Sequence, residues 1–296
     1  MLTREFATDT SIPIPVDLPQ SGMRRLLTRP LFWTGLGLLV GLLLFCFAGP
    51  LVYPKNPLTV HVAWFGHPPS WTLPLGADNL GRNELARMMA GGQQLIVVGL
   101  ASAAMATAIG TAIGLISGFW GGIPDRILSW GMDVVLGIPQ VLPLLLIVVL
   151  LHPDVVTITV VVALTTWPMV GRLVRAESLS TREREYVTAA RSLGASGWRI
   201  LLRHILPNLW GTILIAASNQ VAITVLVVAT ASFLGLGLPP PWPNWPHMVA
   251  SGTSDLLSGY WWLMLFPGLA LVLLQLSVNF IAEAVRKLLA VQGGVR

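Results

Sequence analysis

Long apolar runs with few interruptions are the main pattern along the chain. Six runs carry no charge inside them: Leu31–Tyr53, Met88–Pro124, Val134–Pro153, Val155–Gly171, His204–Ser254 and Leu256–Ala282. A helix needs about 20 mainly apolar residues to cross the hydrocarbon core of a membrane, and most of these runs reach that length. The fifth run is long enough for two helices, but its prolines disfavour a helix through its second half: Pro239, Pro240, Pro241, Pro243 and Pro246. The pattern therefore predicts an all-α polytopic membrane protein with six transmembrane helices.

Composition supports this class. Of the 296 residues, 54% are hydrophobic and only 10% are charged, against about 25% charged in soluble domains. About 30 residues precede the first apolar run, and this run is longer than the 7–15 residues of a signal-peptide core, so we expect a retained helix. The one cysteine, Cys46, excludes an intramolecular disulfide.

The basic residues predict the orientation. With the N-terminus in the cytoplasm, six spans leave only Lys55, Arg82 and Arg87 on the outer side, out of 18 lysines and arginines. This bias follows the positive-inside rule, so both termini are expected in the cytoplasm. The net charge of +5 is then explained by topology and by contact with lipid, and no nucleic-acid partner is expected. Six tryptophans fall on the outer side, as an aromatic belt or a docking surface: Trp64, Trp71, Trp242, Trp245, Trp261 and Trp262.

These spans divide the chain into segments. Residues 1–30 contain Pro13, Pro15 and Pro19 without an apolar period and predict a flexible cytoplasmic tail. The expected segments that follow are the first transmembrane helix (31–53), an external segment (54–92), a core with five transmembrane helices (93–288) that includes a cytoplasmic loop (176–208), and a cytoplasmic C-terminal tail (289–296). The external segment ends in LGADNLGRNELARMM, where a short amphipathic helix is expected from Asn79 onward.

Small residues in the second run predict close helix packing. Gly110, Gly114 and Gly118 recur at four-residue spacing, which lets two helix backbones approach closely in lipid. The spacing leaves open whether the neighbouring helix belongs to this chain or to another.

A few polar residues inside the spans are candidates for a transport pathway. Asp133 is either paired at the cytoplasmic edge, with Arg126 as a candidate partner, or exposed to a pathway, since an unpaired carboxylate in a membrane is costly. Asn219 and Gln220 either bridge helices or line a cavity. Kinks are predicted near Gly137, Pro139 and Pro143, and near Thr165, Thr166 and Pro168.

Signatures of enzymes are missing from the sequence. Neither lysine stands in the Gly-Lys-Ser/Thr context of a phosphate-binding loop, and neither HExxH nor Gly-x-Ser-x-Gly occurs. His61, His67 and His247 match no metal-site spacing. We therefore predict no catalytic residue, no metal site, no cofactor and no ATP site in this chain.

A charged segment between the fourth and fifth spans has a distinct pattern. Arg172 to Arg203 holds seven arginines against three glutamates. Ser180 and Glu183 form a capping-box pattern that predicts a helix from near Thr181, and a left-handed turn at Gly194 would end it. Ser196 can cap a second helix that ends at Pro207.

The corner between these two predicted helices is nearly free of side chains. It consists of Ala189, Ala190, Gly194 and Ala195, flanked by arginines. Such a corner suits insertion into a groove of a polar or acidic partner. From these features alone, a basic loop that faces lipid headgroups is an equal alternative.

The same segment resembles a known signature. Binding-protein-dependent ABC importer permeases carry Glu-Ala-Ala, three residues, Gly, nine residues, Ile, one residue and Leu-Pro at this place. Ala189, Ala190, Gly194, Leu206 and Pro207 match at that spacing, while Thr188 replaces the glutamate and His204 the isoleucine. Further stretches resemble the dipeptide, oligopeptide and nickel type of this family, in the right order: Pro74–Met89, Glu185–Val187, Leu206–Asn208, Ser232–Gly237 and Phe266–Gly268.

The resemblance implies the transmembrane domain of a type I ABC importer in a bacterial inner membrane. Its partners would be a homologous second permease subunit, two ATP-binding cassette ATPase subunits and an external substrate-binding protein. The substrate would be a peptide, nickel or a small metal chelate. ATPase coupling would fall to Thr188, Ala189, Ala190, Gly194, Ala195, Ser196, Leu206 and Pro207. A secondary transporter or channel and a non-transporting membrane scaffold are the alternatives.

Overall fold

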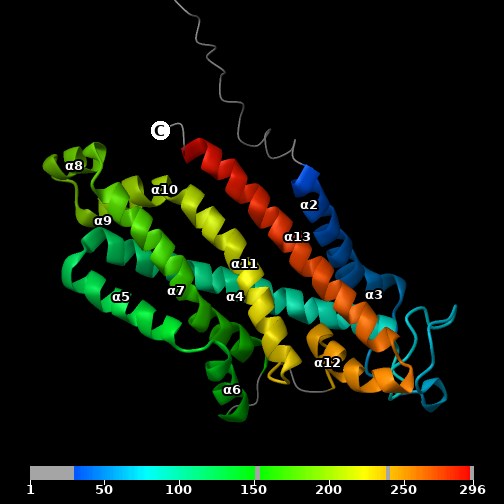
Figure 1. The fold of residues 1–296 in the computed structure, drawn as a ribbon. Coiled ribbons are helices and arrows are strands. Elements are labelled where there is room, and N and C mark those ends of the chain that lie inside the picture. Colours follow the sequence, from blue (N-terminus) through cyan, green and yellow to red (C-terminus); the bar gives the residue numbers. More distant parts are fainter. Residues whose placement is uncertain (1–29, 151–153, 238–240, 294–296) are drawn as a thin grey trace, which may run out of the picture.

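The chain folds into a bundle of long helices that run side by side (Figure 1). The computed structural model describes residues 30–150, 154–237 and 241–293, so residues 1–29 of the predicted tail and residues 294–296 lie outside the described ranges. Within these ranges the chain forms helices and two isolated β-bridges but no strand.

Five helical stretches are long and apolar enough to span a membrane in the described part of the chain. The first joins α2 (Pro30–Leu43), a π-helical segment (Leu44–Ala48) and α3 (Gly49–Val52). The other four are α4 (Glu84–Trp120), α7 (Val155–Arg182), α11 (Trp210–Phe233) and α13 (Trp262–Gly293). They correspond to five of the six predicted spans.

The remaining predicted span, Val134–Pro153, is divided between two helices. α5 (Gly122–Gly137) ends where Ile138 adopts an extended backbone, and α6 (Val141–Leu150) begins after Pro139 and Gln140. The break falls where the sequence predicted a kink, because a proline restrains the preceding residue from helical geometry.

Two expectations about shorter helices were wrong. The second half of His204–Ser254 does contain a helix, α12 (Trp245–Asp255). Pro246 is tolerated because it lies in the first turn, where the backbone N–H groups have no partner within the helix. The amphipathic helix expected from Asn79 onward is the start of α4 itself. The Asn83 side chain accepts a hydrogen bond from the Ala86 amide (2.9 Å) and so caps this long helix at Glu84.

The three spaced glycines of α4 lie where α4 and α7 approach each other most closely. A Cβ atom added to Gly110, Gly114 or Gly118 would lie 2.7, 2.6 or 2.7 Å from a backbone carbonyl oxygen of α7. These carbonyls belong to Trp167, Gly171 and Arg175. The neighbouring helix thus belongs to this chain, and only glycine permits this contact.

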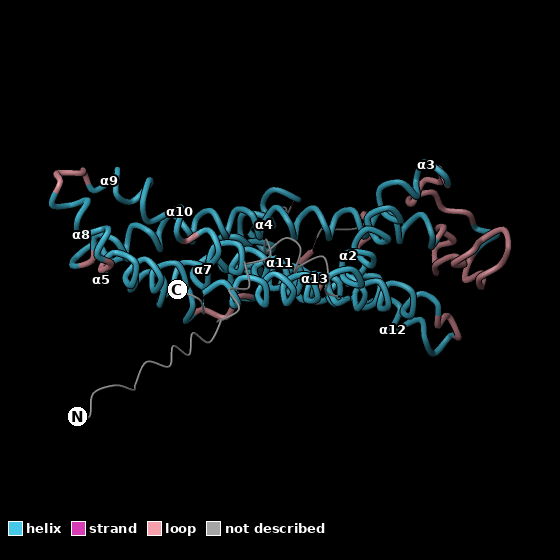
Figure 2. Tube along the Cα trace, turned by 90° about the horizontal axis from the view of Figure 1, so that it is seen from above, coloured by secondary structure: helices cyan, strands magenta, loops and turns pink. Residues whose placement is uncertain are grey.

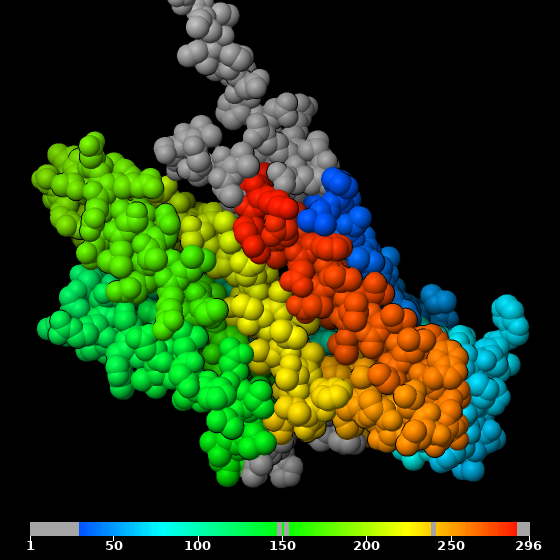
Figure 3. Space-filling view, in the orientation of Figure 1, coloured from blue at the N-terminus to red at the C-terminus, as the bar shows by residue number. Residues whose placement is uncertain are grey.

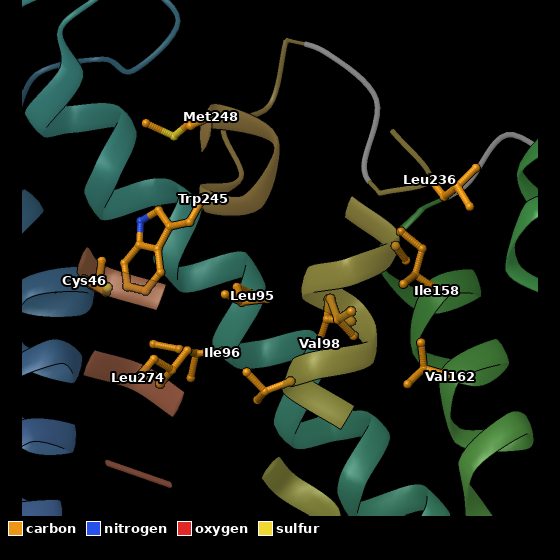
Figure 4. Packing of buried hydrophobic residues seen from close by; sticks show 14 of the residues in the cluster. Cys46, Leu95, Ile96, Val98, Ile158, Val162, Leu236, Trp245, Met248 and Leu274 are labelled. Atoms are coloured by element: carbon orange, nitrogen blue, oxygen red, sulfur yellow. The ribbon is translucent and has the colours of Figure 1, made fainter. Parts of the chain in front are cut away.

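Trp245 is the centre of a second contact region, at the other end of α4 (Figure 4). Its indole N–H donates to the Met88 carbonyl (2.6 Å), and its ring lies beside Cys46 in the same cluster of buried residues. The expectation that the outer tryptophans form a belt or a docking surface was therefore wrong for Trp245 and for Trp262, which are both buried. Trp71 is fully exposed.

Candidate functional site

A helical elbow projects from one end of the bundle, far from the loops of residues 54–83 (Figures 1 and 2). It comprises residues 185–208: α8 (Glu185–Ser192), α9 (Gly197–Ile200), a π-helical segment (Leu201–Ile205) and α10 (Leu206–Asn208). The first helix was expected to start near Thr181, and this was wrong. α7 continues to Arg182 because Ser178 and Thr181 stay buried in its packing, which outweighs the local capping preference.

Backbone hydrogen bonds fix the corner of the elbow. The Ala195 amide donates to the Ala190 carbonyl (3.1 Å), and the Gly194 amide donates to the Arg191 carbonyl (3.0 Å). Gly194 has a φ of +82°, which a residue with a side chain adopts only under strain. This pattern is the Schellman motif, which turns the chain at the end of α8. Ser196 then accepts from the Arg199 amide (3.4 Å) and starts α9.

Buried apolar residues anchor the elbow to the bundle. Val187 of α8 is fully buried and joins Phe119 of α4 and Val174 of α7 in one cluster. The rest of the elbow contributes Ile200, Leu201 and Ile205 to that cluster. The elbow therefore lies on a packed base formed by α4 and α7.

The outer surface of the elbow combines small and polar residues. Thr188, Ala189, Gly194 and Ser196 are exposed, and no atom lies within 4 Å of the position that a Cβ of Gly194 would take. Leu193 is 88% exposed at the tip. The small residues around it leave the Leu193 side chain without cover in the described part of the chain.

The remaining elbow residues that the sequence singled out have internal contacts. Ala190, Ala195 and Leu206 are half-buried against the apolar cluster, so the two alanines are small partly because α8 and α9 pack closely. Pro207 is exposed in the first turn of α10. The structure thus brings all eight predicted coupling residues into one elbow, five of them on its exposed side.

An ion pair braces the helices beneath the elbow. Arg175 of α7 donates two hydrogen bonds to Asp125 of α5, at 2.5 and 2.7 Å, and Ser117 of α4 and Ser129 donate to the same carboxylate. The bonds from Arg175 hold the pKa of Asp125 well below its usual range, against the opposing effect of burial. One carboxylate therefore links α4, α5 and α7.

The pathway candidates take part in contacts between helices. Asp133 on α5 pairs with Arg172 of α7, so Arg126 was the wrong partner, and both side chains of the pair are exposed. Gln220 is buried and donates to Thr166 (2.8 Å), while Asn219 accepts from Arg286 (3.3 Å). Their role in a pathway stays a prediction.

A large apolar groove runs along the face of α4 that carries Ala104, Ala108 and Ala112, and not along the glycines that contact α7. Its volume is about 810 Å³, and residues of α4 and α11, with Trp198 and Leu202 of the elbow, line it. The α4 wall is mostly small: Ala103, Ala104, Thr107, Ala108, Thr111 and Ala112. A surface of small residues on a membrane helix permits close approach of another helix.

Two features were missed by the sequence reasoning. The exposure of Leu193 follows from the turn at Gly194, which the sequence did predict, so a leucine directly before that glycine was the available signal. The second feature is a group of buried charges in the external region, around Glu84 and Arg87. No group of three or more His, Cys, Asp or Glu residues in the described ranges could hold a metal ion.

Two family models match this chain. The model of the binding-protein-dependent transport system inner membrane component matches residues 110–291. A second model, the N-terminal TM domain of oligopeptide transport permease C, matches residues 19–69. Together they reach from the region before the first span almost to the end of α13.

Curated relatives and solved structures are similar to this chain over most of its length. A putative peptide permease protein of Brucella ovis is 39% identical and the match covers 85% of this chain and 84% of the relative. A probable D,D-dipeptide transport system permease protein, DdpC of Escherichia coli, is 33% identical, with 90% and 89% covered. An inward-facing structure of the MetNI methionine ABC transporter has a TM-score of 0.52 and 19% identity, with 67% of this chain and 94% of that chain covered, which shows a shared fold.

Proposed function

The chain belongs to the family of binding-protein-dependent transport system inner membrane components, and on this premise we propose that its elbow couples it to separate ATPase subunits. As a multi-pass membrane permease subunit it transports its substrate with energy supplied by its partners. The sequence lacks a phosphate-binding loop of its own. The energy of ATP then has to enter through a protein contact.

The observation that carries this proposal is the exposed corner on a packed base. Gly194 turns the chain without a side chain, and Leu193 and Ala189 lie exposed beside it. Val187 and Ile200 hold the same segment in the apolar cluster beneath. When a partner moves the corner, this base transmits the movement to α4 and α7, which line the centre of the bundle.

We assign the second permease to the side of the bundle and the external binding protein to the end opposite the elbow. In the proposed complex, two ATPase subunits act on two permease subunits, and the small-residue groove along α4 faces the second, homologous permease. The excess of basic residues around the elbow supports a cytoplasmic location for this end and for both termini. Residues 54–83 and α12 then face outward, where an external binding protein delivers the substrate.

A peptide is the substrate that the relatives favour. Both cited relatives are named as permeases for a peptide or a dipeptide, and we infer the same class for this chain. Nickel or a small metal chelate is the less favoured alternative. Mass spectrometry of the molecules that copurify with the cognate binding protein separates these classes.

Replacement of Gly194 tests the coupling role. Gly194→Glu places a charged side chain on the corner and strains a backbone with positive φ. We expect normal membrane insertion and normal copurification of the second permease, but uptake of less than a tenth of the normal rate. The control is Gly122→Glu, at another exposed glycine that has a positive φ and open space around it. Normal uptake by the Gly194 variant contradicts the proposal.

A further inference from the structure

A polar pocket lies where the loop of residues 54–83 and the start of α4 meet α12 and the start of α13. Figure 3 shows α12 and this loop together at the end of the bundle opposite the elbow. The volume of the pocket is about 230 Å³, below the roughly 300–1,000 Å³ of sites for drug-sized ligands. Six ionisable side chains line it: Asp78, Arg82, Glu84, Arg87, His247 and Asp255. The pocket lies apart from the elbow and from the groove along α4.

Two of these side chains are buried with polar atoms left unbonded. Glu84 is 1% exposed and Arg87 is 6% exposed. Oε1 of Glu84 and Nη1 of Arg87 have no hydrogen-bond partner among the described residues, and Nε of Arg87 lies in an ion pair with Asp78 Oδ2 at 3.4 Å. Unpaired buried polar groups cost free energy, so they are normally satisfied by a ligand or by ordered water.

The other charges of the pocket have partners in the structure. Asp78 accepts hydrogen bonds from Arg82 Nε (2.6 Å) and from the Leu80 and Arg82 amides. Asp255 accepts from Asn79 Nδ2 at 3.1 and 3.3 Å. Burial, and then the charges of Arg87 and Arg82, lower the pKa of His247, so its ring is neutral at pH 7.

We propose that this pocket binds a small zwitterion of amino-acid size, with its carboxylate on Arg87 and its ammonium group on Glu84. Nη1 of Arg87 is an unbonded donor that suits a carboxylate oxygen, and the unbonded Oε1 of Glu84 can accept from an ammonium group. Glu84 and Arg87 are three residues apart on α4, so their side chains start from the same face of that helix and both line the pocket.

The charges in the pocket disfavour simpler ions. A plain anion on Arg87 would also meet the carboxylates of Asp78 and Asp255, and a plain cation beside Glu84 would meet Arg82 and Arg87. A molecule that carries both charges avoids both repulsions. The pocket wall is completed by Trp242, Met248 and Leu263, which limit its size.

Direct binding to the complete chain in lipid nanodiscs tests the proposal. The probes are L-alanine, propionate and ethylammonium, measured by saturation-transfer NMR at pH 7. We expect saturable binding of L-alanine and at least tenfold weaker binding of the two single-charge probes. Equal binding of propionate or ethylammonium, or no saturable binding of L-alanine, overturns the proposal, and this comparison needs no variant.

Variants then locate the site. Arg87→Gln and Glu84→Gln are expected to weaken L-alanine binding at least tenfold, and Asp255→Asn, at a half-buried position, at least twofold. Arg126→Gln, an exposed arginine on α5, is the control and leaves binding unchanged. Unchanged binding in a folded Arg87→Gln chain contradicts the location. Because this assay needs neither ATPase nor uptake, its result is independent of the coupling role.

Discussion

Asn208 donates a hydrogen bond to the Tyr186 hydroxyl (2.9 Å), which joins the two ends of the elbow. The two residues are 22 positions apart, one at the start of α8 and the other at the end of α10. Each residue belongs to a short stretch of the sequence that resembles the permease family, Glu185–Val187 for the tyrosine and Leu206–Asn208 for the asparagine. In the structure these two stretches contact each other and hold the two ends of the elbow together.

Removal of the Tyr186 hydroxyl is expected to loosen the elbow without unfolding the bundle. Tyr186→Phe loses one hydrogen bond at an exposed position, which contributes about 0.5–1.5 kcal/mol. Hydrogen exchange of residues 185–208, followed by mass spectrometry, should become faster while α4 and α7 keep their protection. Tyr260→Phe is the control, because no hydrogen bond to the Tyr260 hydroxyl is found among the described residues. Unchanged exchange in the elbow contradicts the role of this bond.

Alanine at position 194 is expected to distort the corner even though space is available. No atom lies within 4 Å of the added Cβ, but the left-handed backbone costs a residue with a side chain roughly 1–2 kcal/mol. We expect Gly194→Ala to lower transport-coupled ATPase activity several-fold, and Gly194→Asn to lower it less, because asparagine tolerates this conformation better. If alanine and asparagine reduce the activity equally, backbone strain is not the cause.

Side chains in the α4–α7 contact are expected to destabilise the whole bundle. Gly114→Ala places a Cβ 2.6 Å from the Gly171 carbonyl oxygen, and such overpacking typically costs about 1–3 kcal/mol. The midpoint of thermal unfolding in detergent should fall. Gly131→Ala, in α5 with open space around it, is the matched control and should leave the midpoint unchanged or raise it, since alanine favours a helix. Equal midpoints for the two variants contradict the packing argument.

The Asp125 network is expected to make stability depend on pH in the acid range. The folded-state pKa of Asp125 is depressed by Arg175, so its stabilising effect is complete above the unfolded pKa of about 3.9. The effect is lost as the pH falls through the folded pKa. Asp125→Asn removes the charged hydrogen bonds, which contribute about 1.5–3 kcal/mol.

Unfolding midpoints of the wild-type and Asp125→Asn chains should therefore differ at pH 7 and begin to converge as the pH falls below about 4. Glu177→Gln, which changes a half-buried carboxylate on α7, serves as the control and should track the wild type throughout. A difference between wild type and Asp125→Asn that persists unchanged down to pH 3 contradicts the role of the charge.

The apolar pattern predicts most of the fold, because a membrane span needs a long helix whatever its neighbours are. It failed where tertiary contacts decide the outcome. α7 extends to Arg182 through its packing on α4, and the preferred cap at Ser180 is overruled. Trp245 looks like an interfacial ring in the sequence, but the fold buries it between α4 and the first span.

In the candidate site, too, the features set by local sequence were predicted and the features set by contacts between helices were not. The turn at Gly194 and the cap at Ser196 are local, so the sequence predicted them. The partner of Asp133 and the burial of Glu84 and Arg87 depend on which helices meet, and no local pattern reports this. The polar pocket therefore emerged only from the structure.

Chemical crosslinking from the tip of the elbow tests the central claim most directly. The natural Cys46 is buried, so a cysteine introduced by Leu193→Cys is the main reactive thiol in the described part of the chain. In the complete transporter, a maleimide–benzophenone label on this cysteine should join this position to an ATPase subunit on irradiation, and the same label on Leu257→Cys, 98% exposed at the opposite end, should not. The coupling account predicts an ATPase adduct from position 193 alone. The absence of that adduct in an active transporter, or an equal adduct from position 257, would contradict it.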